Sequence, residues 1–135
     1  MKIYFMEQHR KNKEFIINYF NTLRDLGPTK EVLEKYITDE ALIGHIETFE
    51  IAFPKYEIVA DEIIAEGNRV VVQARAKGTH LGNLGGIPPT YKTVDFPFVI
   101  RYEIENEKII SHWMLADQMS LMEQLGVIPA AAATH

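Results

Sequence analysis

Residues 56–79 read YEIVADEIIAEGNRVVVQARAKGT, and this stretch decides the fold. β-branched and other apolar residues recur in two runs, 56–65 and 69–79, which is typical of half-buried strands. Gly67 and Asn68 stand between the runs and favour a tight turn. We therefore expect the two runs to pair as an antiparallel β-hairpin.

A second hairpin is expected in the last third of the chain. Residues 93–105 and 108–116 again have the strand pattern, with a turn at Asn106 and Glu107. The stretch from His80 to Lys92 joins the two hairpins, and its glycines and prolines predict a long loop.

Helical periodicity occupies most of the remaining sequence. Apolar residues at three- and four-residue spacing predict helices over residues 7–26 and 43–53, with a short helix after Thr29 between them. A last short helix is predicted over residues 117–125, and Gly126 should end it. This order predicts an α+β fold in which three N-terminal helices pack on a curved antiparallel sheet, with a short C-terminal helix.

Length and composition narrow the classes of function. The 135 residues predict one domain over 1–128 and a tail over 129–135. A net charge of −5 argues against a nucleic-acid partner, and the lack of cysteine excludes disulfides and thiolate chemistry. No apolar run reaches the roughly 18 residues of a membrane helix, and the N-terminus carries charge too early for a secretory signal. We expect a soluble, cytoplasmic protein.

The last predicted strand carries the main candidate for chemistry, Asp117. Alternation along a strand places Asp117 on the same face as Trp113 if no bulge intervenes. An apolar setting would disfavour the carboxylate anion and raise its pKa, as a general acid/base near neutral pH requires. The alternative is that Asp117 caps the last helix, and the two roles can coexist.

His80 is the second catalytic candidate. It follows three small residues of the same parity, Ala74, Ala76 and Gly78, which leave room for a ligand beside the imidazole. His80 could hold a substrate oxygen or share a proton with Asp117. The alternative is a loop histidine bonded to the backbone.

Five further residues are candidates for substrate binding, each with a plainer alternative. Trp113 could form a flat wall or pack in the core. His45 could face the mouth of a pocket or lie on the surface. Phe49 and Phe53 could contact a ligand or fill the core, and Tyr102 could be a polar handle or a solvated or interface residue. His112 should face the opposite side and be structural or at a subunit interface.

Metal and cofactor chemistry is not expected. His45, His80, His112 and Asp117 match no ligand spacing, and no serine has the context of a nucleophile elbow. The glycines between Gly78 and Gly86 do not join a strand to a helix, so phosphate binding is not expected either.

Seven short motifs, spread over roughly residues 45–126, resemble those of one family in order and spacing. The chain is similar to the SnoaL-like polyketide cyclases or ester cyclases of the nuclear transport factor 2-like (NTF2-like) superfamily. Lys55, Tyr91 and Glu107 replace the usual Asp, Gly and Gly of the family pattern. The motifs are Ala52–Tyr56, Ala65–Val70, Gly78–Gly82, Gly86–Thr90, Glu107–Ile109, His112-Trp113 with Asp117, and Gln124–Gly126.

The resemblance implies a cone-shaped fold with a deep apolar pocket, usually in a dimer. It also implies that Asp117 is the acid/base of an intramolecular aldol closure on an aromatic polyketide ester, with no metal or cofactor. We therefore hypothesise a cyclase or isomerase acting on a small apolar carbonyl compound.

Three other hypotheses remain open. The chain could be a non-catalytic binding protein for a small hydrophobic molecule, or a dimerising scaffold with a vestigial pocket. Hydration or epoxide opening would need further groups such as Asp95 and Arg101. A homodimer is expected, with Val71, Gln73, Val99 and His112 on the outer side of the sheet.

Overall fold

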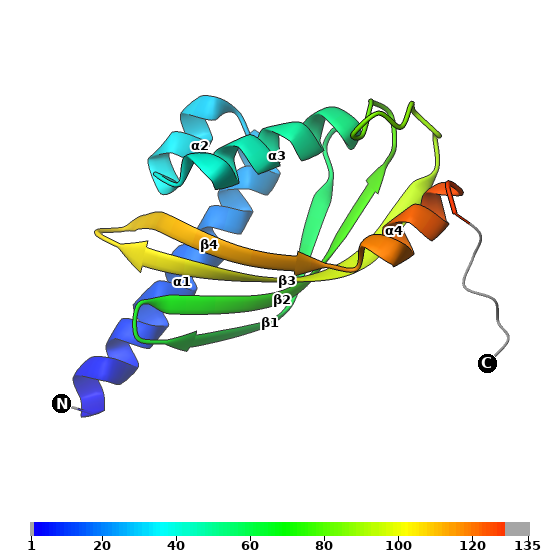
Figure 1. The fold of residues 1–135 in the computed structure, drawn as a ribbon. Helices are drawn as coiled ribbons and strands as arrows, with labels where there is room; N and C mark the ends of the chain where they lie inside the picture. Colours follow the sequence, from blue (N-terminus) through cyan, green and yellow to red (C-terminus); the bar gives the residue numbers. More distant parts are fainter. Residues whose placement is uncertain (1, 129–135) are drawn as a thin grey trace, which may run out of the picture.

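The computed structural model describes residues 2–128, so the tail expected over 129–135 lies outside the described residues. Four helices and four strands follow one another in a helix-first order (Figure 1). Their bounds are α1 Lys2–Leu26, α2 Lys30–Tyr36, α3 Glu40–Ala52, β1 Glu57–Glu66, β2 Arg69–Thr79, β3 Thr93–Glu105, β4 Lys108–Ala116 and α4 Gln118–Leu125.

The four strands form one antiparallel sheet in the order β1-β2-β3-β4, as the two predicted hairpins require. Register shifts between Ala60 and Glu62 and between Glu103 and Ile104 mark irregularities of the kind that bend a sheet. The helices α1, α2 and α3 cover one face, here called the inner face, and α4 lies at one end (Figure 1). The predicted α+β fold class is confirmed.

Alternation along the central strands places the core on this inner face. Val70, Val72, Ala74 and Ala76 of β2 are all buried, while the residues between them are more exposed. Val70, Val72 and Ala74 pack with inward residues of β3 against Ile16, Tyr19, Leu33 and others from the helices, whereas Ala76 belongs to a second cluster with Phe53 and Leu121. Burial of each such large apolar side chain contributes about 1.5 to 3 kcal/mol.

Side-chain caps fix where the helices begin. Thr29 caps α2, and Asp39 caps α3 by accepting hydrogen bonds from the N–H groups of Ala41 and Leu42 at 3.0 and 3.3 Å. The sequence interpretation began the third helix at Ile43, which is wrong because it treated the capping segment as a connector. α1 is also longer than predicted.

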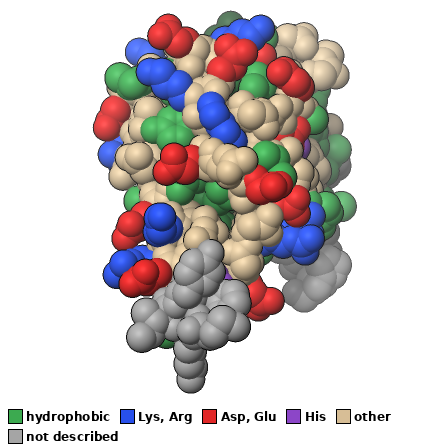
Figure 2. Space-filling model, turned by 90° about the vertical axis from the view of Figure 1, so that its left-hand side faces the viewer, with side chains coloured by type: hydrophobic (Ala, Val, Ile, Leu, Met, Phe, Trp, Pro, Cys, Tyr) green, Lys and Arg blue, Asp and Glu red, His purple; other side chains and the backbone are tan. Residues whose placement is uncertain are grey.

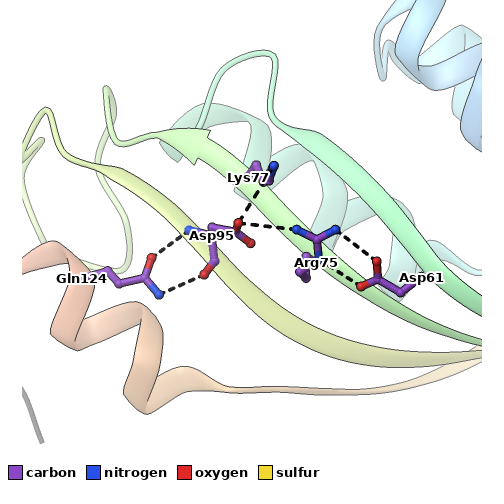
Figure 3. A network of polar contacts seen from close by, with 5 residues as sticks. All are labelled: Asp61, Arg75, Lys77, Asp95 and Gln124. Carbon is purple, nitrogen blue, oxygen red and sulfur yellow. Dashed lines mark hydrogen bonds and ion pairs between the residues drawn. The ribbon is translucent and has the colours of Figure 1, made fainter.

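Helix α4 is held against β3 by one glutamine (Figure 3). Strand β4 ends at Ala116, so the edge of β3 beyond it has no strand partner. The Gln124 amide replaces one: it accepts from the Asp95 N–H at 2.7 Å and donates to the Asp95 carbonyl at 3.0 Å. This side chain holds α4 in place together with Leu121 and Leu125, which are buried in one cluster with Val94 and Phe96 of β3.

The outer face of the sheet bears charged groups of both signs. Arg75 bridges Asp61 and Asp95, and Lys77 also approaches Asp95 (Figure 3). Figure 2 likewise shows basic and acidic side chains interspersed over a neighbouring side of the molecule, without a basic patch. Such exposed ion pairs contribute little to stability.

Four non-glycine residues, Lys55, Tyr91, Asn106 and Glu107, occupy a left-handed backbone conformation that favours glycine. Tyr91 has φ of 61° and Glu107 has φ of 58°, and both replace glycines of the family pattern. Each costs on the order of 1 kcal/mol relative to an unstrained residue. The local folds of the loop and the second hairpin turn are therefore imposed by their surroundings.

None of the helices among residues 2–128 has both the length and the apolar character needed to cross a membrane.

The loop from His80 to Lys92 is tied to the end of α3 at Gly82. The N–H groups of Leu81 and Gly82 both donate to the carbonyl of Ala52, at 3.0 and 3.1 Å. A Cβ on Gly82 would collide with the carbonyl oxygen of Ile51. This contact requires glycine for steric reasons alone.

We predict opposite effects for two glycine substitutions. Gly82→Ala should lower the free energy of unfolding by about 2 kcal/mol or more, because the backbone must move apart. Gly44→Ala should raise it by up to about 1 kcal/mol, since Gly44 lies within α3 with open space around it. Urea unfolding measures both, and a Gly82→Ala protein as stable as the wild type would contradict the packing described.

Candidate active site

A cavity of about 200 Å³, here called the inner pocket, lies between the inner face of the sheet and the helices. Its wall is mostly apolar, and the residues that can donate or accept hydrogen bonds through side chains are few. It is lined by Tyr19, Phe20, Leu23, Leu42, His45, Ile46, Thr48, Phe49, Tyr56, Ile58, Ala76, Leu84, Phe96, Phe98, Ile100, Tyr102, Met114, Ala116, Gln118, Leu121 and Met122.

Helix α3 supplies an aromatic wall. His45, Phe49 and Phe53 recur every four residues and so share one helix face. Phe49 stacks on Phe53 with ring centroids 4.7 Å apart, and on its other side His45 lies 6.5 Å away with nearly parallel rings. Phe53 stacks in turn on His80 at 5.3 Å. Four rings thus form a continuous stack that limits where a ligand can lie.

Three tyrosines bring hydroxyl groups to the inner pocket. Tyr19 comes from α1, Tyr102 from β3 and Tyr56 from the residue before β1. Burial raises the pKa of Tyr19 and of Tyr102; Tyr102 and Tyr56 raise that of Tyr19 further, and Tyr56 raises that of Tyr102. Burial and then the charge of Glu50 raise the pKa of Tyr56. All three are therefore neutral hydrogen-bond donors at physiological pH.

Within the described part of the chain, these three hydroxyls have no protein hydrogen-bond partner. Among the described residues, the one tyrosine hydroxyl with a protein hydrogen bond is that of Tyr36, 2.9 Å from Thr22 Oγ1. Since buried polar groups normally have a partner, free donors in an apolar cavity are available to a ligand.

His45 lies exposed at the edge of the inner pocket. Partial burial of the imidazole lowers its pKa, and the nearby His112 lowers it further. His45 is therefore neutral near pH 7, with one ring nitrogen able to accept a proton.

His112 belongs to a structural pair. Its Nδ1 lies 2.7 Å from Asp39 Oδ2, and the two side chains are only 17% and 13% exposed. Burial acts to raise the pKa of Asp39, but hydrogen bonds from His112 and from the backbone of Leu42 and Ala41 outweigh it and lower the pKa. The pair joins the start of α3 to β4.

A comparison with known protein families identifies the family of this chain. A family model described as SnoaL-like polyketide cyclase matches residues 28–125, well over half of the chain. The chain belongs to the SnoaL-like polyketide cyclase family. No curated protein matches the sequence.

Solved structures agree in fold. AclR of Streptomyces galilaeus, a proposed hydroxylase, is 20% identical, with 90% of this chain and 84% of that chain aligned and a TM-score of 0.77. A proposed SnoaL-like polyketide cyclase from Jannaschia sp. CCS1 is 24% identical over 90% and 95% of the two chains, with a TM-score of 0.76. IdmH of Streptomyces antibioticus, a proposed polyketide cyclase, is 19% identical over 85% and 98%, with a TM-score of 0.71.

Asp117, the acid/base residue implied by resemblance to SnoaL-like cyclases, lies outside the wall of the inner pocket. It is exposed and caps α4, its Oδ1 accepting from the Ser120 N–H at 3.0 Å. Its chain neighbours Ala116 and Gln118 both line the inner pocket. The expected desolvation of Asp117 is therefore not found, and its catalytic role stays a prediction.

His80 is completely buried and does not line the inner pocket. Its Nδ1 accepts from the Thr90 N–H at 3.1 Å and lies 3.0 Å from Thr90 Oγ1, while its Nε2 is buried without a partner among the described residues. These bonds close the loop between the two hairpins. The predicted catalytic role of His80 is untested, and its surroundings are those of a structural residue.

Strand β4 turns the opposite face inward from the one expected. Met114 and Ala116 line the inner pocket, whereas Trp113 is 49% exposed on the outer face. Alternation holds only where no bulge intervenes, and the register shift between Ile109 and Ser111 is such a bulge, so Ile109 is buried whereas Trp113, of the same parity, points outward. Trp113 therefore does not line the inner pocket, and its role in ligand binding stays a prediction. His112 accordingly lies on the helix side.

The inner pocket therefore brings together His45, Phe49 and Tyr102 of the predicted binding residues, with Phe53 buried behind Phe49. Sequence reasoning missed Tyr19 and Tyr56. Tyr19 lies in the apolar stripe of the helix predicted over residues 7–26, where only its hydroxyl could indicate a pocket. Among residues 2–128 no cluster of three or more His, Cys, Asp or Glu side chains could hold a metal ion.

We predict that the Asp39–His112 pair makes stability depend on acid pH. Because the folded pKa of Asp39 lies below its ordinary value of 3.8, the stabilisation is complete at neutral pH and is lost as the pH falls through that lowered pKa. Asp39→Asn keeps a capping residue but should lower the free energy of unfolding by about 1 to 2 kcal/mol at pH 7. Urea unfolding at pH 7 and pH 3 measures this.

The difference between wild type and Asp39→Asn should shrink at the lower pH. Asp25→Asn, at an exposed carboxylate beside Arg24, is the matched control and should change little. A constant difference at both pH values would contradict the assigned pKa shift.

Proposed function

We propose that this SnoaL-like protein is an enzyme that performs cofactor-independent acid/base chemistry, an aldol-type cyclisation or an isomerisation, on a small apolar carbonyl compound. The observation that supports the proposal is the inner pocket itself, where neutral tyrosines and a neutral histidine lie in a mostly apolar wall.

The tyrosines suit a carbonyl oxygen. A carbonyl offers lone pairs to the free hydroxyls of Tyr19, Tyr56 and Tyr102, and its oxygen gains negative charge when a neighbouring carbon loses a proton. Donors already in place in a dry cavity stabilise that charge more than they stabilise the neutral substrate. Their raised pKa keeps them protonated for this task.

Two residues are candidates for moving the proton. His45 lies at the pocket edge and is neutral, so it can accept a proton from a carbon beside the carbonyl. Asp117, which the family resemblance favours, lies between two pocket-lining residues and caps α4 with Oδ1. A moderate rotation of its side chain would be needed for contact with a ligand.

We predict that the protein accelerates deuterium exchange beside the carbonyl of 2-tetralone, a bicyclic ketone, measured by NMR in D2O. His45→Gln should lower the rate by 10²-fold or more, and Tyr102→Phe by about tenfold. The rate should fall as the pH drops through the His45 pKa, which lies below 6.5, because protonated His45 cannot accept a proton.

Asp117→Asn decides between the two candidate bases, because asparagine also caps a helix. If Asp117→Asn loses most of the exchange rate while His45→Gln stays active, Asp117 is the base. No exchange by the wild type with 2-tetralone or other small ketones, or unchanged rates in both variants, would refute the proposal.

A second candidate function is non-catalytic binding of a small hydrophobic molecule. The exposed position of Asp117 and the enclosed position of His80 favour it, since neither predicted catalytic group reaches the cavity. It requires that ketones bind in the inner pocket without accelerated exchange.

We further propose that the protein forms a homodimer through the outer face of the sheet. Ile64, Val71, Arg101 and Trp113 are directly paired across the four strands, and Leu115 lies beside this row. Ile64, Trp113 and Leu115 are 55%, 49% and 64% exposed, and Arg101 Nε is buried without a partner among the described residues. A second copy would cover these apolar groups.

We predict that Leu115→Lys halves the mass measured in solution by light scattering, because a charge in the apolar patch opposes association. Ile51→Lys, at an equally exposed residue of α3 on the other side of the molecule, is the control and should leave the mass unchanged. A wild-type monomer would refute the homodimer.

A further inference from the structure

A second cavity, here called the outer groove, lies beside the inner pocket. It has a volume of about 780 Å³ and is bordered by the end of α1, the end of α3 and strand β1. Four residues line both spaces, so each of these side chains faces the inner pocket on one side and the outer groove on the other. They are Phe20, Leu23, Tyr56 and Ile58, here called the partition.

The partition forms where α1 packs against β1. Phe20 and Leu23 are three residues apart on α1 and share one helix face, while Ile58 comes from β1. Tyr56 precedes that strand. All four residues are half-buried, as expected of side chains with space on two sides.

Three contacts fix the position of Tyr56 in the partition. Its N–H donates to the Phe53 carbonyl at 3.1 Å. Its ring meets Phe49 edge to face, with centroids 4.8 Å apart. On β2, a Cβ on Gly78 would lie only 3.2 Å from the Tyr56 Cβ, so the strand backbone packs closely on this tyrosine. Tyr56 therefore cannot move aside without loss of these contacts.

The two spaces that the partition separates differ in chemical character. No Asp, Glu, Lys or Arg lines the inner pocket. The outer groove, in contrast, is bordered by Arg24, Asp25, Glu50, Lys55 and Glu57. Hydrogen bonds to a carbonyl oxygen are stronger in a space from which charged groups and their water are excluded. The partition thus preserves the apolar setting that the tyrosine hydroxyls need.

The position of the partition also limits the size of a ligand. An apolar cavity of about 150 Å³ in a protein accommodates benzene. The inner pocket, at about 200 Å³, therefore suits one ring or two fused rings. A third fused ring would press against the partition or project from the open edge near the exposed His45, where it gains few contacts.

We propose that the partition sets the size of the substrate: the protein takes carbonyl compounds with one ring or two fused rings, and Leu23, Tyr56 and Ile58 are the specificity-determining residues that exclude a third. This inference rests on the proposed role of the inner pocket as the substrate site and adds the size class of that substrate.

Two matched ketones test it: 2-acetylnaphthalene and 2-acetylanthracene, which carry the same carbonyl group on two and three fused rings. Leu23→Ala shortens the partition without removing a hydrogen-bonding group. It should raise the affinity for the three-ring ketone relative to the two-ring ketone by about tenfold, because the added ring becomes buried. Equilibrium dialysis, with each ketone measured by its absorbance, gives the two affinities.

Two further variants make the test specific. Ile58→Ala shortens the partition from the strand side and should give the same change, so the test does not depend on the folding of Leu23→Ala alone. Met114→Ala removes as many heavy atoms as Leu23→Ala, but Met114 lies on β4 and lines the inner pocket without lining the outer groove. This control should leave the ratio of affinities near that of the wild type.

An unchanged ratio in the partition variants, or an equal change in Met114→Ala, would overturn the inference. Dialysis measures binding alone, so the expected change in a protein that shows no exchange on 2-tetralone supports the size limit and refutes the proposed catalysis. Exchange together with an unchanged ratio refutes the size limit and leaves the proposed function standing. Failure of the wild type to bind either ketone refutes the size limit and the substrate site together.

Discussion

Attachment of α3 at both of its ends is the constraint on which the rest of the structure depends. At its start, Asp39 pairs with His112, and the Thr38 N–H donates to the Ile109 carbonyl of β4 at 3.0 Å. At its end, the Ala52 carbonyl accepts two N–H groups from the loop after β2. The helix spans the distance between these points, and the sheet bends beneath it. A space remains between them, because the facing residues of β2 near its end are alanines rather than large side chains.

The same attachment explains which residues became structural. His80 and Thr90 are hydrogen-bonded across the loop that contacts the end of α3. His80 stacks on Phe53, and Phe53 stacks on Phe49 of the cavity wall, so the loop and the wall hold each other in position. Stacked rings have few rotamers to lose, so they form a wall of defined shape. His80 thus influences the inner pocket through Phe53 without lining it.

Local signals in the sequence predicted the helices, strands and turns well, and most of the errors concern the direction in which side chains point. The Gly67-Asn68 turn and the Gly126 cap depend on neighbouring residues alone, and both are where the sequence places them. The inward face of β4 changes at the bulge between Ile109 and Ser111, which no local sequence signal marks, so Trp113 points outward although Ile109, of the same parity, is buried. Tyr19 was missed for a related reason: spacing identifies an inward side chain but does not distinguish a filled core from a cavity.

The chemical character of the inner pocket follows from the cost of burying charge. A carboxylate in an apolar cavity without a partner would lose most of its hydration, whereas a tyrosine hydroxyl loses far less and stays neutral. The protein accordingly places tyrosines within the cavity, His45 at its edge and carboxylates such as Asp117 and Glu50 outside its wall. A substrate of the proposed kind would meet hydrogen-bond donors first and the candidate bases only at the margins. The pocket should therefore select substrates that carry an oxygen able to accept hydrogen bonds. Proton transfer should occur at the part of the substrate that projects toward the edge of the pocket, near His45.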